Sequence, residues 1–96
     1  MFTKRTVIRK YIRFYGSVQA VGFRYYAKNA ADLCGATGWV RNEYDGSVTM
    51  EIQGTERQIA DTIDGIKRGR YIHIDCMEEK AIDVDPDERG FRVRYH

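Results

Sequence analysis

Segments with the two-residue period of a β-strand and segments with helical periodicity alternate along this chain in one particular order. Strand patterns cover residues 7–15, 39–44, 48–52, 71–80 and 91–95. Apolar residues at helical spacing begin at Phe23 and again at Ile59. The order is therefore strand, helix, strand, strand, helix, strand, with one extra strand at the end. It predicts an α+β fold of the ferredoxin-like, split β-α-β kind, with two helices packed on one face of an antiparallel sheet.

Turn and capping signals separate these segments. Gly35 follows the first helical pattern, and Gly69 follows the second. The dipeptide at residues 45–46, Asp-Gly, is a strong hairpin signal between two strands. Thr55 and Gln58 have the spacing of a capping box at the start of the second helix. The local sequence thus agrees with the predicted order.

The size of the chain limits what it can hold. With 96 residues, 43% of them hydrophobic, we expect a single domain over residues 1–96 with one core and one site. No signal peptide and no apolar stretch long enough to span a bilayer are visible, so we expect a cytoplasmic protein without a membrane partner. Two cysteines are too few for a disulfide framework or a metal cluster, and we expect Cys34 and Cys76 to be buried free thiols.

Charge is distributed unevenly although its sum is small. The net charge of +2 does not indicate nucleic-acid binding. No acidic residue precedes Asp32, whereas seven basic residues do: Lys4, Arg5, Arg9, Lys10, Arg13, Arg24 and Lys28. Two interpretations remain open. Either later acids balance this basic face in three dimensions, or the stretch creates a positive field that attracts a small anion.

The loop between the first strand and the first helix has the features of an anion site. Its end is a helix N-terminus, where backbone N–H groups lack partners and the helix dipole favours negative charge. Arg24 lies in the first helical turn, where a cation is disfavoured by about 0.3–1 kcal/mol unless an anion binds. Two interpretations of Arg24 remain open: it binds a phosphate together with this loop, or it is an ordinary arginine that is solvated or paired with a distant acid. The loop consists of Gly16, Ser17, Val18, Gln19, Ala20, Val21, Gly22 and Phe23.

Two polar residues of this loop have simpler interpretations. Ser17 lacks the G-x-S-x-G nucleophile elbow and has no histidine close in sequence, so we interpret it as a loop-capping hydroxyl. The amide of Gln19 suits either the anion site or a brace within the loop. Asn42, taken alone, is typical of a turn beside a hairpin, and the sheet face that it occupies depends on the length of that turn.

Two motifs together resemble the signatures of the acylphosphatase family. The first is Gly16-x-Val18-Gln19-x-Val21-x-Phe23-Arg24, and the second is Gly38-Trp39-Val40-Arg41-Asn42-x-x-x-Gly46-x-Val48, followed by Gly54. Their order and spacing agree with the family, and the resemblance covers essentially the whole chain. One departure concerns the loop: Ala20 stands where the family usually has glycine. If the loop needs a positive φ there, alanine costs roughly 1–2 kcal/mol.

The resemblance implies a function and roles for two residues. It implies a hydrolase that splits acyl phosphates into a carboxylate and inorganic phosphate, without a metal or another cofactor. Arg24 would bind the phosphoryl group together with loop N–H groups, and Asn42 would orient the attacking water. We expect the substrate's own phosphate to accept the water proton. We further expect a monomer whose partners are the small-molecule substrate and its phosphate product, with no nucleic acid.

Other signals carry less weight. The Asp83-x-Asp85-x-Asp87 run lacks the glycine and the final glutamate of a calcium loop, so we interpret it as a solvated acidic turn. His73 and His96 lack the spacing of metal ligands. Residues 89–95 faintly echo the aromatic signature of an RNA-recognition module, but with the wrong spacing. A non-catalytic anion-binding domain, as in larger carbamoyl-phosphate-using proteins, is the other alternative, and the single-domain length argues against it.

Overall fold

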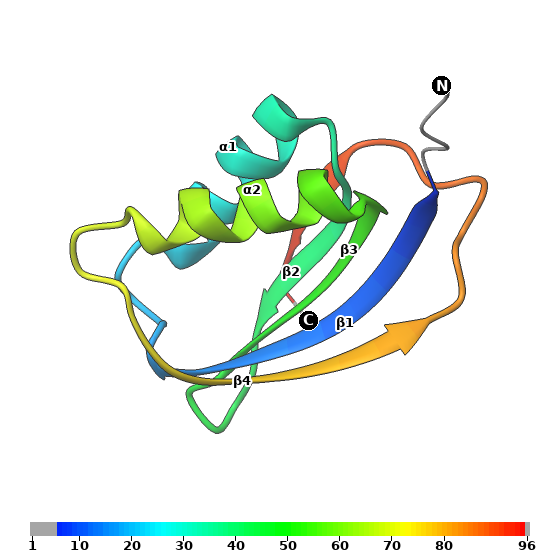
Figure 1. The fold of residues 1–96 in the computed structure, drawn as a ribbon. Helices are drawn as coiled ribbons and strands as arrows, with labels where there is room; N and C mark the ends of the chain where they lie inside the picture. Colours follow the sequence, from blue (N-terminus) through cyan, green and yellow to red (C-terminus); the bar gives the residue numbers. More distant parts are fainter. Residues whose placement is uncertain (1–5, 96) are drawn as a thin grey trace.

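The predicted order of strands and helices is confirmed by the computed structural model, which describes residues 6–95 (Figure 1). Two helices lie side by side on one face of a five-stranded sheet. This is the ferredoxin-like α+β architecture expected from the sequence. The elements are β1 (Val7–Ser17), α1 (Phe23–Cys34), β2 (Thr37–Asn42), β3 (Val48–Thr55), α2 (Glu56–Lys67), β4 (His73–Ile82) and β5 (Phe91–Arg94).

The sheet has the strand order β4-β1-β3-β2-β5. The first four strands pair antiparallel, but β5 pairs parallel with β2, so the expectation of a wholly antiparallel sheet is wrong at this edge. The reason lies in the path of the chain. After β4, residues 83–90 cross the sheet at the end where β4 finishes. Strand β5 therefore starts at that end and runs opposite to β4, which is the direction of β2.

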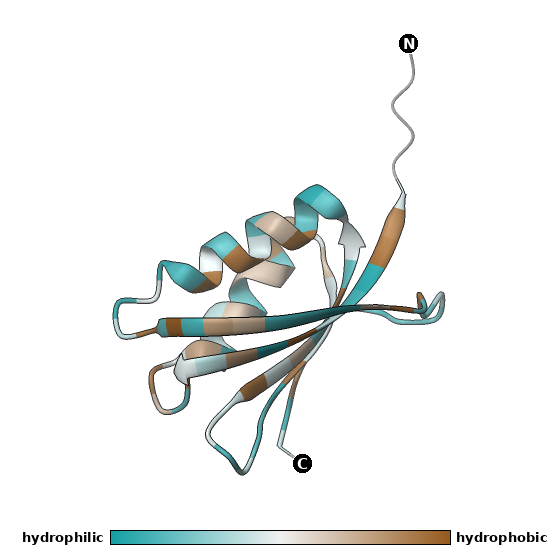
Figure 2. Ribbon diagram, turned by 60° about the horizontal axis from the view of Figure 1, so that its bottom comes forward, coloured by the Kyte–Doolittle hydropathy of each residue, from teal (hydrophilic) through white to brown (hydrophobic). Residues whose placement is uncertain are grey.

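The core lies between the helices and the sheet, which form two layers in Figure 2. Apolar side chains from both layers pack together there. The rings of Phe14 on β1 and Phe23 on α1 pack with their centroids 4.8 Å apart. At the N-terminus of α2, Thr55 and Gln58 form the predicted capping box. The fully buried members of the core include Ile12, Phe14, Ala27, Ala31, Val40, Val48, Met50, Ile52 and Ile66.

A β-bulge interrupts the pairing of β1 with β4. Tyr15 lies opposite Cys76, but Gly16 lies opposite Ile74, so Asp75 is an extra residue in β4. Gly16 has φ +130°, and a Cβ atom there would lie 2.2 Å from the carbonyl oxygen of His73. Only glycine fits this close approach of two backbones.

The bulge corrects the expectation that both thiols are buried. An extra residue moves all later side chains of a strand to the other face. Ile74 therefore packs towards the helices, whereas Cys76 lies on the open face of the sheet and is exposed. Cys34, the last residue of α1, is half-buried.

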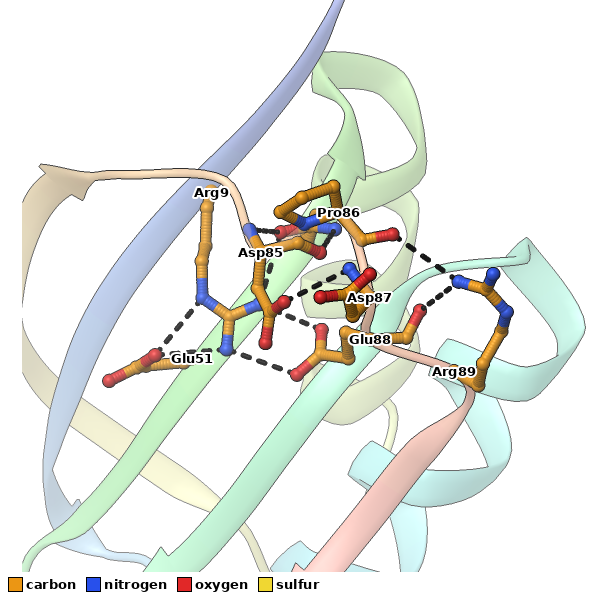
Figure 3. Close-up of polar contacts among 8 residues, drawn as sticks. Arg9, Glu51, Asp85, Pro86, Asp87, Glu88 and Arg89 are labelled. Carbon is orange, nitrogen blue, oxygen red and sulfur yellow. Dashed lines mark hydrogen bonds and ion pairs between the residues drawn. The ribbon is translucent and has the colours of Figure 1, made fainter.

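On the open face of the sheet, Arg9 links the sheet to residues 83–90, the crossing segment between β4 and β5 (Figure 3). Its side chain is 6% exposed and donates hydrogen bonds to Glu51 of β3 and to Glu88, at 2.7–3.1 Å. The side chain of Gln53 accepts a hydrogen bond from the backbone N–H of Asp85 at 2.8 Å and donates one to the Asp85 carbonyl oxygen at 2.9 Å. The acidic turn expected to be merely solvated is thus held at its backbone and at Glu88, contacts that fix the path towards β5.

Candidate active site

Helix α1 begins without a side-chain cap. Its N-cap residue, Gly22, has φ +83°, and the first turn contains no acidic residue. The carbonyl of Gly22 accepts the first helical hydrogen bond, from the N–H of Tyr26 at 3.0 Å. The N–H groups that precede this bond have no acceptor within the helix, so this end of α1 suits an anion.

Ala20 has the backbone conformation that its position in the loop makes costly. Its φ is +58°, and it is the one non-glycine residue with positive φ among residues 6–95. The left-handed region disfavours residues with a Cβ atom by about 1–2 kcal/mol. The loop therefore does require the conformation for which glycine is best suited.

An open cavity of about 350 Å³ lies at this helix N-terminus. It brings together Arg24 of α1 and Asn42 at the end of β2, which are 18 residues apart in the sequence. Four residues of the predicted loop line the cavity, namely Val18, Ala20, Gly22 and Phe23. The other lining residues are Tyr25, Lys28, Val93 and Tyr95.

The position of Asn42 follows from the register of the β2–β3 hairpin. Asn42 lies opposite Val48, and directly opposed residues of an antiparallel pair point to the same face. Val48 is fully buried under the helices, so Asn42 also points to the helix side. Within residues 6–95, the Asn42 amide has no hydrogen-bond partner from the protein. Its donors and acceptor are therefore available inside the cavity.

Arg24 is held by an aromatic ring rather than by an acid. Its guanidinium carbon lies 4.8 Å from the centroid of the Tyr95 ring, a cation–π distance. Across the part of the chain that the structure describes, no carboxylate pairs with Arg24. Its charge is therefore available to an anion in the cavity.

The ion pairs decide between the two interpretations of the basic N-terminal stretch. Lys4 and Arg5 lie outside the described residues. Of the five described cations before Asp32, four pair with acids and only Arg24 does not. The face is thus balanced in three dimensions, and one cation remains for a ligand. The pairs are Arg9 with Glu51 and Glu88, Lys10 with Glu79, Arg13 with Asp45, and Lys28 with Asp32.

Gln19 braces the loop instead of pointing to the cavity. Its Nε2 donates to the carbonyl oxygens of Glu43 and Ser47, at 2.7 and 2.8 Å. Both acceptors belong to the turn that follows Asn42, so this amide fixes the loop relative to Asn42. Three other predicted loop residues also lie away from the cavity lining: Gly16 and Ser17 at the end of β1, and Val21 packed on the core.

The turn after Asn42 is stiffened by the carboxylates of Glu43 and Asp45. The Thr49 hydroxyl and the Arg41 Nε donate to Glu43, and mainly the first of these bonds lowers the pKa of Glu43 below its ordinary value. Asp45 accepts from the hydroxyl and the N–H of Ser47, which lowers its pKa as well. Both carboxylates are thus ionised hydrogen-bond acceptors near neutral pH. They hold the turn on which Asn42 depends.

Sequence reasoning missed four residues of the cavity. Lys28 follows Arg24 by four positions and so shares its helix face, a signal that was available. Tyr25 precedes Lys28 by three positions on the same helix. Val93 lies on β5 and Tyr95 directly follows that strand, so their presence in the cavity depends on the parallel pairing of β5 with β2, which the local sequence does not specify.

Signals of other site types lead to no site in the described residues. His73 is exposed at the start of β4, and His96 lies outside the described residues. Within residues 6–95, no group of three or more His, Cys, Asp or Glu side chains has an arrangement that holds a metal ion. The helices of this same range are all too short or too polar to cross a membrane.

Comparison with known proteins agrees with the two signatures. A sequence model of the acylphosphatase family matches residues 10–93. The chain is 42% identical to an acylphosphatase of Geobacillus thermodenitrificans, over 83% of this chain and 86% of that protein. It is 38% identical to one from Oceanobacillus iheyensis, over 83% and 90%. The crystal structure of acylphosphatase from Bacillus subtilis superimposes with a TM-score of 0.83 at 27% identity, covering 92% of this chain and 99% of that one. This protein therefore belongs to the acylphosphatase family, the hydrolases that split acyl phosphates into a carboxylate and inorganic phosphate.

Proposed function

We propose that the cavity between the N-terminus of α1 and the end of β2 is the active site, with Arg24 binding the phosphoryl group and Asn42 orienting the attacking water. One observation carries this proposal. The guanidinium of Arg24 and the amide of Asn42 line the same cavity, and within residues 6–95 neither has a hydrogen-bond or ion-pair partner from the protein. Polar groups placed in this way are available to a ligand.

The phosphoryl group would be bound by charge and by backbone donors together. A guanidinium meets two phosphate oxygens at once, and charge-assisted bonds of this kind are roughly twice as strong as neutral ones. The N–H groups between Ala20 and Arg24 would supply further donors at the positive end of the helix dipole. Donors fixed in this way stabilise the charge that spreads over the equatorial oxygens in the transition state.

Asn42 would act on the water rather than on the substrate. An amide is not a base near pH 7, but it holds a water molecule by donating and accepting hydrogen bonds. The water oxygen would form a bond to phosphorus as the bond from phosphorus to the acyl oxygen breaks. The electron pair of that bond leaves on the carboxylate, and a phosphoryl oxygen takes the water proton. A carboxylate is a good leaving group, so we expect this step to need no metal or cofactor.

Hydrolysis of a simple aryl acyl phosphate with a chelator present tests the proposal. We expect the wild-type protein to turn over without added metal. We expect Arg24→Ala to lose both rate and affinity for inorganic phosphate. Tyr71→Ala, which removes a ring outside the cavity that is 66% exposed, is the matched control and should keep full activity. Loss of wild-type activity in chelator, or a fully active Arg24→Ala variant, contradicts the proposal.

We also propose that the chain acts as a single cytoplasmic domain and as a monomer, without nucleic-acid or membrane partners. The small net charge of +2 supports the expectation that the protein does not bind nucleic acid. Non-specific binding to nucleic acid depends on many contacts of basic side chains with phosphates. Light scattering of the purified protein tests the monomer, and fractionation of cells tests the location. A stable dimer, or recovery with membranes, overturns the corresponding part.

A further inference from the structure

A hollow of about 570 Å³ lies on the open face of the sheet, the face opposite the candidate active site. Phe91 and Val93 of β5 pack towards the helices, so Arg92 and Arg94 point to the open face, where both are exposed. Both arginines line the hollow together with Trp39, which lies opposite Arg92 on β2. The proposed reaction uses none of these three side chains.

The ring of Trp39 holds guanidinium groups in place. The guanidinium carbons of Arg41 and Arg94 lie 5.1 and 4.9 Å from the ring centroid, which are cation–π distances. Arg41 also donates to Glu43, whereas neither Arg92 nor Arg94 has an acidic partner within residues 6–95. A carboxylate that binds Arg94 costs less conformational entropy, because the ring already restricts that side chain. The open face thus carries two available cations at alternate positions of one strand.

β5 is an edge strand, so one side of its backbone is open. Among the described strands it pairs only with β2, and an edge strand presents unpaired N–H and C=O groups to a further strand. A segment that adds there places every second side chain on the open face. Acidic residues two positions apart in that segment would lie beside Arg92 and Arg94, where opposite charges attract across the strands. We propose that β5 docks an extended, acidic segment of a partner protein in this way.

Two features favour a protein segment over a nucleic-acid strand. Single strands bind largely by stacking their bases on aromatic rings, but two guanidinium groups already contact the ring of Trp39. The carboxylates of Asp85 and Asp87 also line the hollow, and both residues precede β5 in the chain (Figure 3). They would repel a continuous polyanion that runs through the hollow. A short strand beside residues 91–94 needs to place its carboxylates only on the arginines.

Titration with short peptides tests this docking site. The probe is a capped peptide of alternating threonine and glutamate. Binding is measured by isothermal titration calorimetry and located by the fluorescence of Trp39, the only tryptophan of the chain. We expect binding that changes this fluorescence and weakens as salt is added. A peptide of the same composition, with the two residue types alternating in pairs, has no two glutamates two positions apart. It should bind about 2- to 5-fold more weakly, the effect of one lost cross-strand pair.

Charge reversal on β5 tests the same site from the side of the protein. Arg92→Glu with Arg94→Glu would place like charges beside the peptide and should abolish binding. Arg57→Glu with Arg70→Glu is the matched control, since it changes the net charge equally at exposed positions outside the hollow. It should keep the affinity within about 2-fold at physiological salt, where distant charges are screened. A thermal melt checks that both are folded, and the milder Arg92→Gln with Arg94→Gln should weaken binding by about 2- to 30-fold.

Four outcomes would overturn the inference, which does not depend on the proposed reaction. They are no binding of the alternating peptide, equal affinity for the two peptides, equal losses in the two charge-reversal variants, and tighter binding of a single-stranded oligonucleotide of the same charge. The last of these would assign the surface to nucleic acid instead of a protein.

Discussion

The guanidinium of Arg24 lies over the ring of Tyr95, 4.8 Å from its centroid, and this contact joins the start of α1 to the residue that follows β5. A cation–π contact at an exposed site contributes about 0.5–1 kcal/mol and more when water is excluded. Tyr95 therefore restricts the orientation of the flexible Arg24 side chain at the cavity. It does so without neutralising the charge, as a carboxylate would.

The first prediction concerns this contact. Tyr95→Leu should raise the inhibition constant of inorganic phosphate by about 2- to 5-fold, because Arg24 becomes free to adopt other rotamers. Tyr95→Phe keeps the ring and should behave like the wild type. Competition assays with inorganic phosphate measure both. Equal inhibition constants for the Tyr95→Leu and Tyr95→Phe variants would show that the ring does not position Arg24.

Ala20 gives a prediction about stability. Ala20→Gly should raise the free energy of unfolding by about 0.5–1 kcal/mol, because relief of the left-handed strain exceeds the added entropy of the unfolded chain. For a domain of this size the melting temperature should rise by about 2–8 °C. Ala60→Gly, at an exposed position inside α2, is the control and should lower stability by about 1 kcal/mol. A loss of stability in both variants would contradict the account of Ala20.

Gln19 should affect the rate although it does not line the cavity. Gln19→Ala removes the two hydrogen bonds to the turn after Asn42, so the loop and Asn42 are no longer fixed relative to each other. We expect kcat to fall by about 10-fold, since small misplacements of reacting groups reduce rates strongly. Gln19→Glu should be worse, because a carboxylate faces two carbonyl oxygens. A Glu variant with wild-type kcat would argue against the brace.

Arg9 should matter for stability and not for the chemistry. Arg9→Met removes the partner of Glu51 and Glu88 beneath the crossing segment and should destabilise the fold by about 2–4 kcal/mol. Arg57→Met on α2 breaks an exposed pair with Asp61 and should cost less than about 0.5 kcal/mol. Urea midpoints compare the two. Similar midpoints for both variants would mean that the ion pairs of Arg9 with Glu51 and Glu88 contribute little to the free energy of unfolding.

Much of the fold was predictable because it rests on local signals. The capping box of Thr55 and Gln58 and the hairpin at residues 45–46 depend on neighbours in the sequence, and both were predicted correctly. The exposure of Cys76 was not, because one extra residue in β4 reverses the strand alternation and the cause lies in Gly16 of another strand. The parallel pairing of β5 was missed for a similar reason, since contacts of Arg9 with Glu88 guide the chain there.

The candidate site divides in the same way. The anion-binding role that we propose for the loop before Arg24 follows from a helix start and from glycine, both visible in the sequence. The bracing role of Gln19 and the presence of Tyr95 depend on which segments meet in space, so the local sequence does not fix them. The sheet face of Asn42 required the register of the hairpin. Whether a residue lines the cavity or only supports the fold therefore depends on contacts between segments that are distant in the sequence.

The separation of roles between Arg24 and Asn42 is tested most directly by the thermal shift that inorganic phosphate produces. A ligand that binds the folded state raises the melting temperature, and at a fixed ligand concentration the rise grows with the logarithm of its affinity. Asn42→Ala should retain the phosphate-induced shift of the wild type while its kcat falls by about 100-fold or more. Arg24→Ala should lose the shift altogether. A retained shift in Arg24→Ala, or an abolished shift in Asn42→Ala, would contradict the account.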